Sequence, residues 1–104
     1  MFEPLAIYDE YSRDHGYPSI SEFISDARYE NQDKIIDYLK HRGKVWASAA
    51  GMARDYIKNV SSHIPEELLD DGKYVWSNSL TYHVEKYNLR LPADVEKYIL
   101  SKMA

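Results

Sequence analysis

The segment from Arg42 to Gly51, RGKVWASAAG, places a glycine and a lysine before a run of very small residues. A phosphate-binding loop has the pattern G-x-x-x-x-G-K-[ST], because its backbone amides cradle phosphates and its hydroxyl binds magnesium. Tyr38 stands at the first glycine position of that pattern, and Val45 stands where serine or threonine is needed. No strand pattern leads into the segment. We therefore expect no nucleotide-binding loop here.

The four histidines offer no metal-binding pattern. No two of them have the spacing H-x-x-x-H, and the chain contains no cysteine. The nearest metal-like pair is Asp37 with His41, one helical turn apart, and two ligands do not complete a zinc site. His41 is better explained as a residue at a helix end that interacts with carbonyl groups or with Asp37. We expect neither a metal nor a cofactor.

Catalytic groups are equally hard to assemble from the sequence. Paired carboxylates occur only in stretches that look exposed, whereas a general acid needs an apolar environment that raises its pKa. Ser61, Ser62 and His63 are neighbours in the chain, but no glycine-flanked elbow presents either serine as a nucleophile. We expect no catalytic residue and no enzymatic activity.

The charge is unevenly distributed along a chain whose net charge is −4. Residues 1–33 contain eight acidic residues and two arginines. An acidic surface of this kind can oppose a basic nucleic-acid channel by imitating phosphate charge. The acidic residues that we expect to bind a protein partner are Asp9, Glu10, Asp14, Glu22, Asp26 and Glu30.

The middle of the chain is basic and supports an alternative function. A basic patch with an aromatic side chain is what single-stranded nucleic acid requires. The candidate residues are Lys34, Lys40, Arg42, Lys44, Trp46, Arg54 and Lys58. The isoelectric point near 5.5 argues against nucleic acid as the main partner. The sequence leaves open which of the two surfaces is functional.

The sequence predicts that helices position these candidate residues. At 104 residues the chain is expected to form one domain, residues 1–104. Apolar spacing predicts an all-α fold, a compact bundle of about five short helices, with residues 72–76 as a candidate extended segment. The first helix is expected over residues 3–14. A capping-box pattern, Ser19 with Glu22, predicts the start of the second.

Four further helices complete the predicted bundle. Asn31 is expected to cap a helix that ends at Gly43, Ser77 to cap another, and Pro92 to open the last. Residues 44–59 are expected to form a central helix, because the small residues from Ala47 to Gly51 would let a neighbouring helix approach closely. Residues 60–72 are expected to connect it to the next helix, with one helical turn at residues 65–69.

Ten tyrosines are unusual in a chain of this length. A tyrosine joins an apolar ring to a polar tip, so it suits a core boundary or a protein interface. We expect most of them at the core boundary and some at a partner surface. A homodimer, through the small-residue helix or the tyrosines, is a third functional alternative.

The phrases DKIIDYLKHRGKVWASAAGMARDYI and DGKYVWSNSLTYHVEKYNLRLPADVEKYIL resemble small proteins encoded on conjugative and other mobile elements of Gram-positive gut bacteria. The resemblance covers most of the chain from Pro18 onward. It implies no catalytic residue. It implies a setting in which small proteins block host defence machinery, so we expect a stoichiometric inhibitor of a nucleic-acid-targeting complex, of anti-CRISPR or anti-restriction type.

The sequence also predicts where the protein acts. The N-terminus has neither the basic start nor the apolar core of a signal peptide. No apolar run approaches the ~20 residues that a membrane-spanning helix needs. We expect a cytoplasmic protein that does not enter a membrane.

Overall fold

The structure, a computed structural model, describes residues 3–5, 8 and 16–103. These residues form a mixed fold of one sheet and three α-helices, so the prediction of an all-α helical bundle and a purely helical domain is wrong. The elements in chain order are β1 (Glu3–Pro4), a single 3₁₀ turn η2 (Ile20–Glu22), α1 (Gln32–His41), β2 (Lys44–Asp55), β3 (Val60–Asp70), β4 (Tyr74–Ser77), α2 (Asn78–Tyr87) and α3 (Ala93–Lys102).

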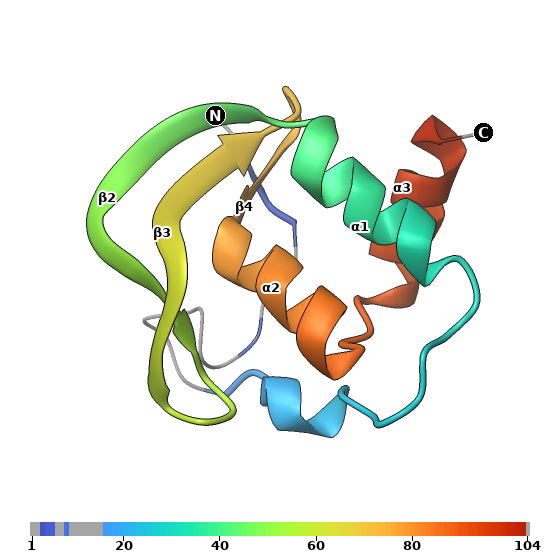
Figure 1. Cartoon of the computed structure of the whole chain (residues 1–104). Helices are drawn as coiled ribbons and strands as arrows, with labels where there is room; N and C mark the ends of the chain where they lie inside the picture. Colours follow the sequence, from blue (N-terminus) through green and yellow to red (C-terminus); the bar gives the residue numbers. More distant parts are fainter. Residues whose placement is uncertain (1–2, 6–7, 9–15, 104) are drawn as a thin grey trace.

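The strands follow the order β1-β4-β3-β2 across the sheet. β3 is antiparallel to both of its neighbours, whereas the short β1 runs parallel to β4. The β2–β3 hairpin is long and curved, and α2 lies on its concave side with α1 and α3 beyond it (Figure 1). The helices therefore cover one side of the sheet, and β2 forms one of its edges.

The segment predicted as the central helix is strand β2 followed by a turn. Its last residues alternate between buried and exposed, with Ala53 and Asp55 buried and Arg54 exposed, which is the period of a strand. Alanine, serine and glycine occur at both buried and exposed positions. The small residues of this segment therefore do not distinguish the 3.6-residue period of a helix from the two-residue period of a strand. The neighbouring β3 supplies the hydrogen-bonding partner that decides the structure.

The segment predicted as a connector, residues 60–72, contains strand β3. Proline normally disqualifies a central strand because it lacks an N–H group. Pro65 is tolerated because it lies opposite Met52, between two register irregularities of the β2–β3 pair. β4 pairs with β3 only from Leu68 onward, so Pro65 has no second neighbour to bond. The predicted helical turn at residues 65–69 is therefore wrong.

Several local predictions are confirmed. The Ser77 hydroxyl accepts a hydrogen bond from the Ser79 amide at the start of α2. The last helix follows Pro92, and residues 74–77 are extended. The Ser19–Glu22 capping box is present, but it caps only the turn η2, so the longer helix predicted after it is wrong. The first predicted helix lies largely outside the described residues; within them, Glu3–Pro4 is a strand.

The core lies between the sheet and the helices. Its buried side chains come from every layer and include Leu5, Ile20, Ile35, Leu39, Trp76, Leu80, Val84, Leu89 and Ile99. Trp76 also donates a hydrogen bond from Nε1 to the Leu39 carbonyl at 3.2 Å. Gly43 packs against this ring, since a Cβ there would lie only 2.7 Å from it. The α1–β2 corner is thus held against β4 by Trp76.

Candidate functional site

Asp55, at the end of β2, is buried but fully hydrogen-bonded. Oδ1 accepts from the amides of Ile57 and Lys58, and Oδ2 accepts from the hydroxyls of Tyr82 at 2.7 Å and Tyr87 at 2.6 Å. Burial alone would raise the pKa of Asp55, but these hydrogen bonds lower it to about 2. A carboxylate held in this way is a structural anion and a poor general acid.

Asp71, after β3, repeats this arrangement. Oδ1 accepts from the amides of Lys73 and Tyr74, and Oδ2 accepts from the hydroxyls of Tyr38 and Tyr98. Burial opposes ionisation here too, yet the hydrogen bonds hold the pKa of Asp71 below its usual value. Both clusters therefore tie a hairpin turn to helices.

His83 is completely buried on α2, and both of its ring nitrogens are used. Nε2 accepts a hydrogen bond from the Tyr56 amide at 3.0 Å, so Nδ1 carries the proton and donates to the Ser79 carbonyl at 2.7 Å. Ser62 is buried as well, and its hydroxyl donates to the Ala53 carbonyl. Neither residue is arranged as a nucleophile or as its base.

The tyrosines serve mainly to join elements. Six hydroxyls donate hydrogen bonds to carboxylates or carbonyls within the protein, those of Tyr8, Tyr29, Tyr38, Tyr82, Tyr87 and Tyr98. Burial is the main cause that raises the pKa of Tyr29, to about 12. Among the described tyrosines only Tyr17 is exposed, at 41%. The described tyrosines therefore lie chiefly at the core boundary.

The predicted acidic surface is only partly described. Asp9, Glu10 and Asp14 lie outside the described residues. Glu22 accepts a hydrogen bond from the Ser19 amide in the capping box. Asp26 and Glu30 are exposed in the segment that leads from η2 to α1. All three of these described acidic residues are exposed, and they follow one another along the chain from η2 to the start of α1.

The predicted basic set separates into two groups. Lys34 and Lys40 lie on α1, and Arg42 and Lys44 lie where α1 gives way to β2. Arg54 and Lys58 lie at the other end of β2, where Arg54 bonds the Asn59 carbonyl. Lys40 forms an ion pair with Glu85 at 2.8 Å. The basic residues thus flank β2 at both ends.

Strand β2 carries more exposed large apolar side chains than any other described element. β2 stands last in the strand order, and β3 is its only strand neighbour among the described residues. Residues 44–48 and 51–52 are exposed, including Val45 at 55% and Met52 at 52%. Unpaired strand edges with exposed apolar side chains are sites at which another strand can pair. We call residues 44, 45, 47, 48, 51, 52 and 54 the β2 edge.

A shallow apolar pocket extends from Trp46 on β2 across the neighbouring strands. Its volume is about 190 Å³, and all four strands contribute to it. The lining residues are Pro4, Trp46, Leu68, Val75, Trp76, Ser77 and Leu80. When an extended segment adds to a sheet, pockets that take its alternate side chains give specificity.

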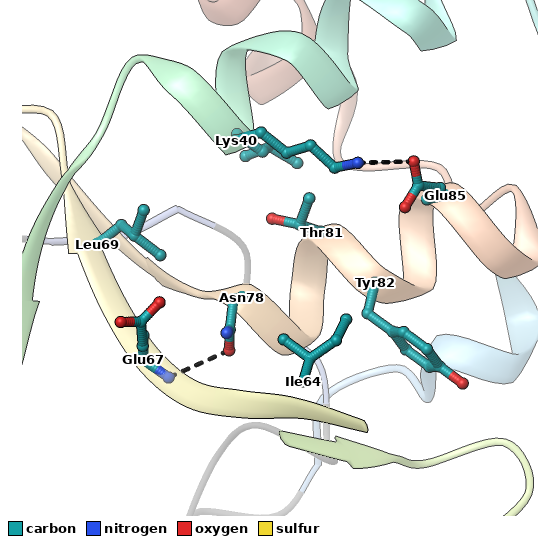
Figure 2. A pocket seen from close by; sticks show the side chains of 9 residues that line it. Lys40, Ile64, Glu67, Leu69, Asn78, Thr81, Tyr82 and Glu85 are labelled. Carbon is teal, nitrogen blue, oxygen red and sulfur yellow. Dashed lines mark hydrogen bonds and ion pairs between the residues drawn. The ribbon is translucent and has the colours of Figure 1, made fainter. Parts of the chain in front are cut away.

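A second pocket, of about 220 Å³, lies between α1, α2 and β3. Figure 2 shows Lys40 reaching from α1 to Glu85 on α2 along one side of it. Its apolar lining comes from Leu39, Ile64 and Leu69. Its polar lining comes from Lys40, Glu67, Asn78, Thr81, Tyr82 and Glu85. We call this the Thr81 pocket.

The hydroxyl of Thr81 is the unusual feature of this pocket. The residue is 6% exposed, and Oγ1 has no hydrogen-bond partner among the described residues. In Figure 2 the hydroxyl is directed into the space between α2 and β3. An unpaired buried polar group costs about 1–3 kcal/mol, so native proteins contain few of them. Sequence reasoning missed Thr81, because no motif marks it.

Comparisons with protein-family models, curated proteins and solved structures found no significant match to this chain. The resemblance to small mobile-element proteins stays a prediction.

Among the described residues, no three histidine or acidic side chains lie close enough together to hold a metal ion. None of their helices combines the length and the apolar character needed to cross a membrane. The two features left to explain are the β2 edge and the Thr81 pocket.

Proposed function

We propose that this protein is a non-enzymatic binding module that captures an extended segment of a partner protein along β2. The observation that carries the proposal is the β2 edge, which ends the described strand order β1-β4-β3-β2 and leaves Val45 and Met52 more than half exposed. Strand addition obtains affinity from main-chain hydrogen bonds and specificity from pockets for alternate side chains. The apolar pocket beside β2 supports the second of these requirements.

Charge selects the kind of segment that the β2 edge would take. Arg42 and Lys44 stand at one end of β2, and Arg54 and Lys58 stand at the other. The single acidic residue of the strand, Asp55, is buried and bonded to tyrosines. A complementary partner is therefore apolar in its middle and acidic at both ends.

The same charges disfavour pairing with a second copy. An antiparallel β2–β2 pair would bring the Arg42 and Lys44 end of one copy beside the Arg54 and Lys58 end of the other. Like charges placed opposite each other across a strand pair are destabilising. A distinct acidic partner fits the edge better than self-association does.

The more specific hypothesis is inhibition of a host nucleic-acid-targeting complex in the cytoplasm. It draws support from the resemblance to mobile-element proteins and from the exposure of Asp26 and Glu30. In this hypothesis the β2 edge holds the partner, and the acidic residues oppose a basic channel. Charge reversal of those acids would then reduce inhibition more than binding.

A designed peptide panel tests strand addition directly. The probes are peptides of alternating valine and threonine with either two acidic or two basic residues at each end. We expect saturable binding of the acidic-ended peptide, with amide NMR shifts concentrated in β2. The variant R42E/K44E should lose at least ~10-fold in affinity. The control K34E/K97E makes the same charge change on α1 and α3 and should bind normally.

The proposal fails if both double variants bind the acidic-ended peptide as the unmodified protein does. It also fails if the shifts avoid residues 44–54. A variant of an apolar residue adds an independent check. Val45→Lys removes an exposed apolar side chain from the β2 edge and leaves the core intact. It should weaken binding without lowering the urea midpoint of unfolding.

Nucleic acid remains the alternative partner, supported by the exposed cations at both ends of β2. A single-stranded oligonucleotide would bind with an affinity that falls steeply with salt, because phosphate contacts release counterions. Binding of the oligonucleotide without binding of the acidic-ended peptide would favour this alternative. The variant R42E/K44E should weaken binding of both the acidic-ended peptide and the oligonucleotide. The salt titration is therefore the experiment that distinguishes the two partners.

A further inference from the structure

The Thr81 pocket has the size and lining of a small-molecule site. Its volume of about 220 Å³ exceeds the ~150 Å³ of an engineered apolar cavity that binds benzene. Leu39, Ile64 and Leu69 give it apolar walls from α1 and β3. A ring with one short substituent would therefore fit between the helices and the sheet.

The polar groups of the pocket are mostly acceptors. Asn78 is occupied, since its Oδ1 accepts from the Glu67 amide and its Nδ2 donates to the Pro65 carbonyl. Thr81 Oγ1 is buried without a partner among the described residues, and the Glu67 carboxylate takes part in no ion pair within that part of the chain. The Glu67 carboxylate can only accept hydrogen bonds, and the Thr81 hydroxyl can accept or donate, so a ligand that donates hydrogen bonds can satisfy both.

The charge at the rim favours a cation. Glu67 and Glu85 carry two negative charges, and Lys40 carries one positive charge that is already paired with Glu85 at 2.8 Å. The pocket is therefore net negative, and its one ammonium group is engaged. Figure 2 shows the Thr81 hydroxyl and the Glu67 side chain on the same side of Lys40, between α2 and β3.

We propose that the Thr81 pocket binds a small organic cation, an apolar ring or branched body that carries one primary ammonium group. The apolar body would contact Leu39, Ile64 and Leu69. The ammonium group would donate to Thr81 Oγ1 and to the Glu67 carboxylate. This site is independent of the β2 edge and of the function proposed for it.

Benzylamine is the probe, and two molecules of matched shape are its controls. Benzyl alcohol keeps the ring and a donor without the charge, and phenylacetate replaces the cation by an anion. We expect benzylamine to shift the amide NMR signals of Thr81 and Leu69 saturably. Benzyl alcohol should bind at least ~10-fold more weakly, and phenylacetate should not bind. Equal binding of all three, or no saturable shift with benzylamine, overturns the proposal.

Thr81→Val separates a ligand-binding hydroxyl from a structural one, because valine keeps the shape and removes the oxygen. We expect the urea midpoint of the free protein to stay level or rise, and benzylamine affinity to fall at least ~10-fold. Thr81→Ser should retain binding. A lower urea midpoint in Thr81→Val would mean that the hydroxyl is satisfied in the free protein, and the proposal would be wrong.

A charge variant supplies the second, independent test. Glu67→Gln removes the negative charge from the pocket, and the exposed Glu30→Gln makes the same change away from it. Glu67→Gln should weaken benzylamine binding at least ~10-fold, and Glu30→Gln should leave it unchanged. Equal affinity in the two variants would contradict the role assigned to Glu67.

Discussion

Asp55 and Asp71 perform the same task at two places in the molecule. Each accepts two amides of its own turn and two tyrosine hydroxyls from helices. Asp55 joins the β2–β3 turn to α2, and Asp71 joins the β3–β4 turn to α1 and α3. Ionised acceptors bind such donors more strongly than neutral ones do. Much of the tyrosine content of the chain is explained by these two anions.

Asp55 should make stability depend on pH in the acid range. Its pKa is about 2 in the folded protein and near 3.8 when the chain is unfolded. Because the folded value is the lower one, the stabilisation is present above pH 4 and disappears as the pH falls toward 2. The shift corresponds to roughly 2 kcal/mol. Urea unfolding measured across this range should show the loss.

Asp55→Asn should remove this dependence and lower stability at neutral pH. An amide has one acceptor atom for four donors, so we expect a loss of about 2–4 kcal/mol in the free energy of unfolding at pH 7. The loss of stability at acid pH should become smaller but should not vanish, since the pKa of Asp71 is also lowered in the folded protein. Asp26→Asn, in an exposed segment, should change neither. A variant Asp55→Asn as stable as the unmodified protein would contradict the assignment.

At the scale of elements, the sequence predicts best where a side chain acts on its own backbone. Ser77 caps α2 and Ser19 forms its capping box with Glu22, because both interactions span only a few residues. β2 and β3 escaped prediction because their pairing joins residues 44 and 70, which no local pattern connects. The helical spacing of residues 45–57 was real, but backbone pairing with β3 overrode it.

Asn31 shows how a correct position can have a different cause. It directly precedes α1 as predicted, yet its φ is +66° and its side chain makes no capping bond. The left-handed conformation favours glycine. Asn31→Gly should therefore stabilise the protein by up to about 1 kcal/mol, and Asn31→Ala should destabilise it by about 1 kcal/mol. A true side-chain cap would instead make Asn31→Gly unfavourable and Asn31→Ser neutral in urea unfolding.

At the scale of the whole molecule, the candidate sites depend on distant parts of the chain. Arg42, Lys44, Arg54 and Lys58 were recognisable as a basic set, but only the strand places them at opposite ends of one edge. The Thr81 pocket joins residues 39–40 to residues 64–85, and its residues carry no shared motif. Composition predicts a binding protein, but the surface proposed for that function can be recognised only from the tertiary structure.

The charges at the ends of β2 should control self-association. At physiological salt we expect a monomer in sedimentation experiments, because antiparallel β2 pairing brings cations together from the two copies. In ~1 M salt the Debye length falls to about 3 Å, so the repulsion is screened and association should increase. The apolar residues Val45 and Met52 then favour pairing.

The variant R42E/K44E gives the sharpest form of this prediction. It would place acidic residues at one end of β2, where they would face Arg54 and Lys58 of a second copy. We therefore expect this variant to dimerise at physiological salt, with the dimer weakening as salt rises, opposite to the unmodified protein. K34E/K97E, which carries the same net charge, should stay monomeric. If R42E/K44E also stays monomeric, β2 is not a pairing edge, and the proposed binding mode loses its physical basis.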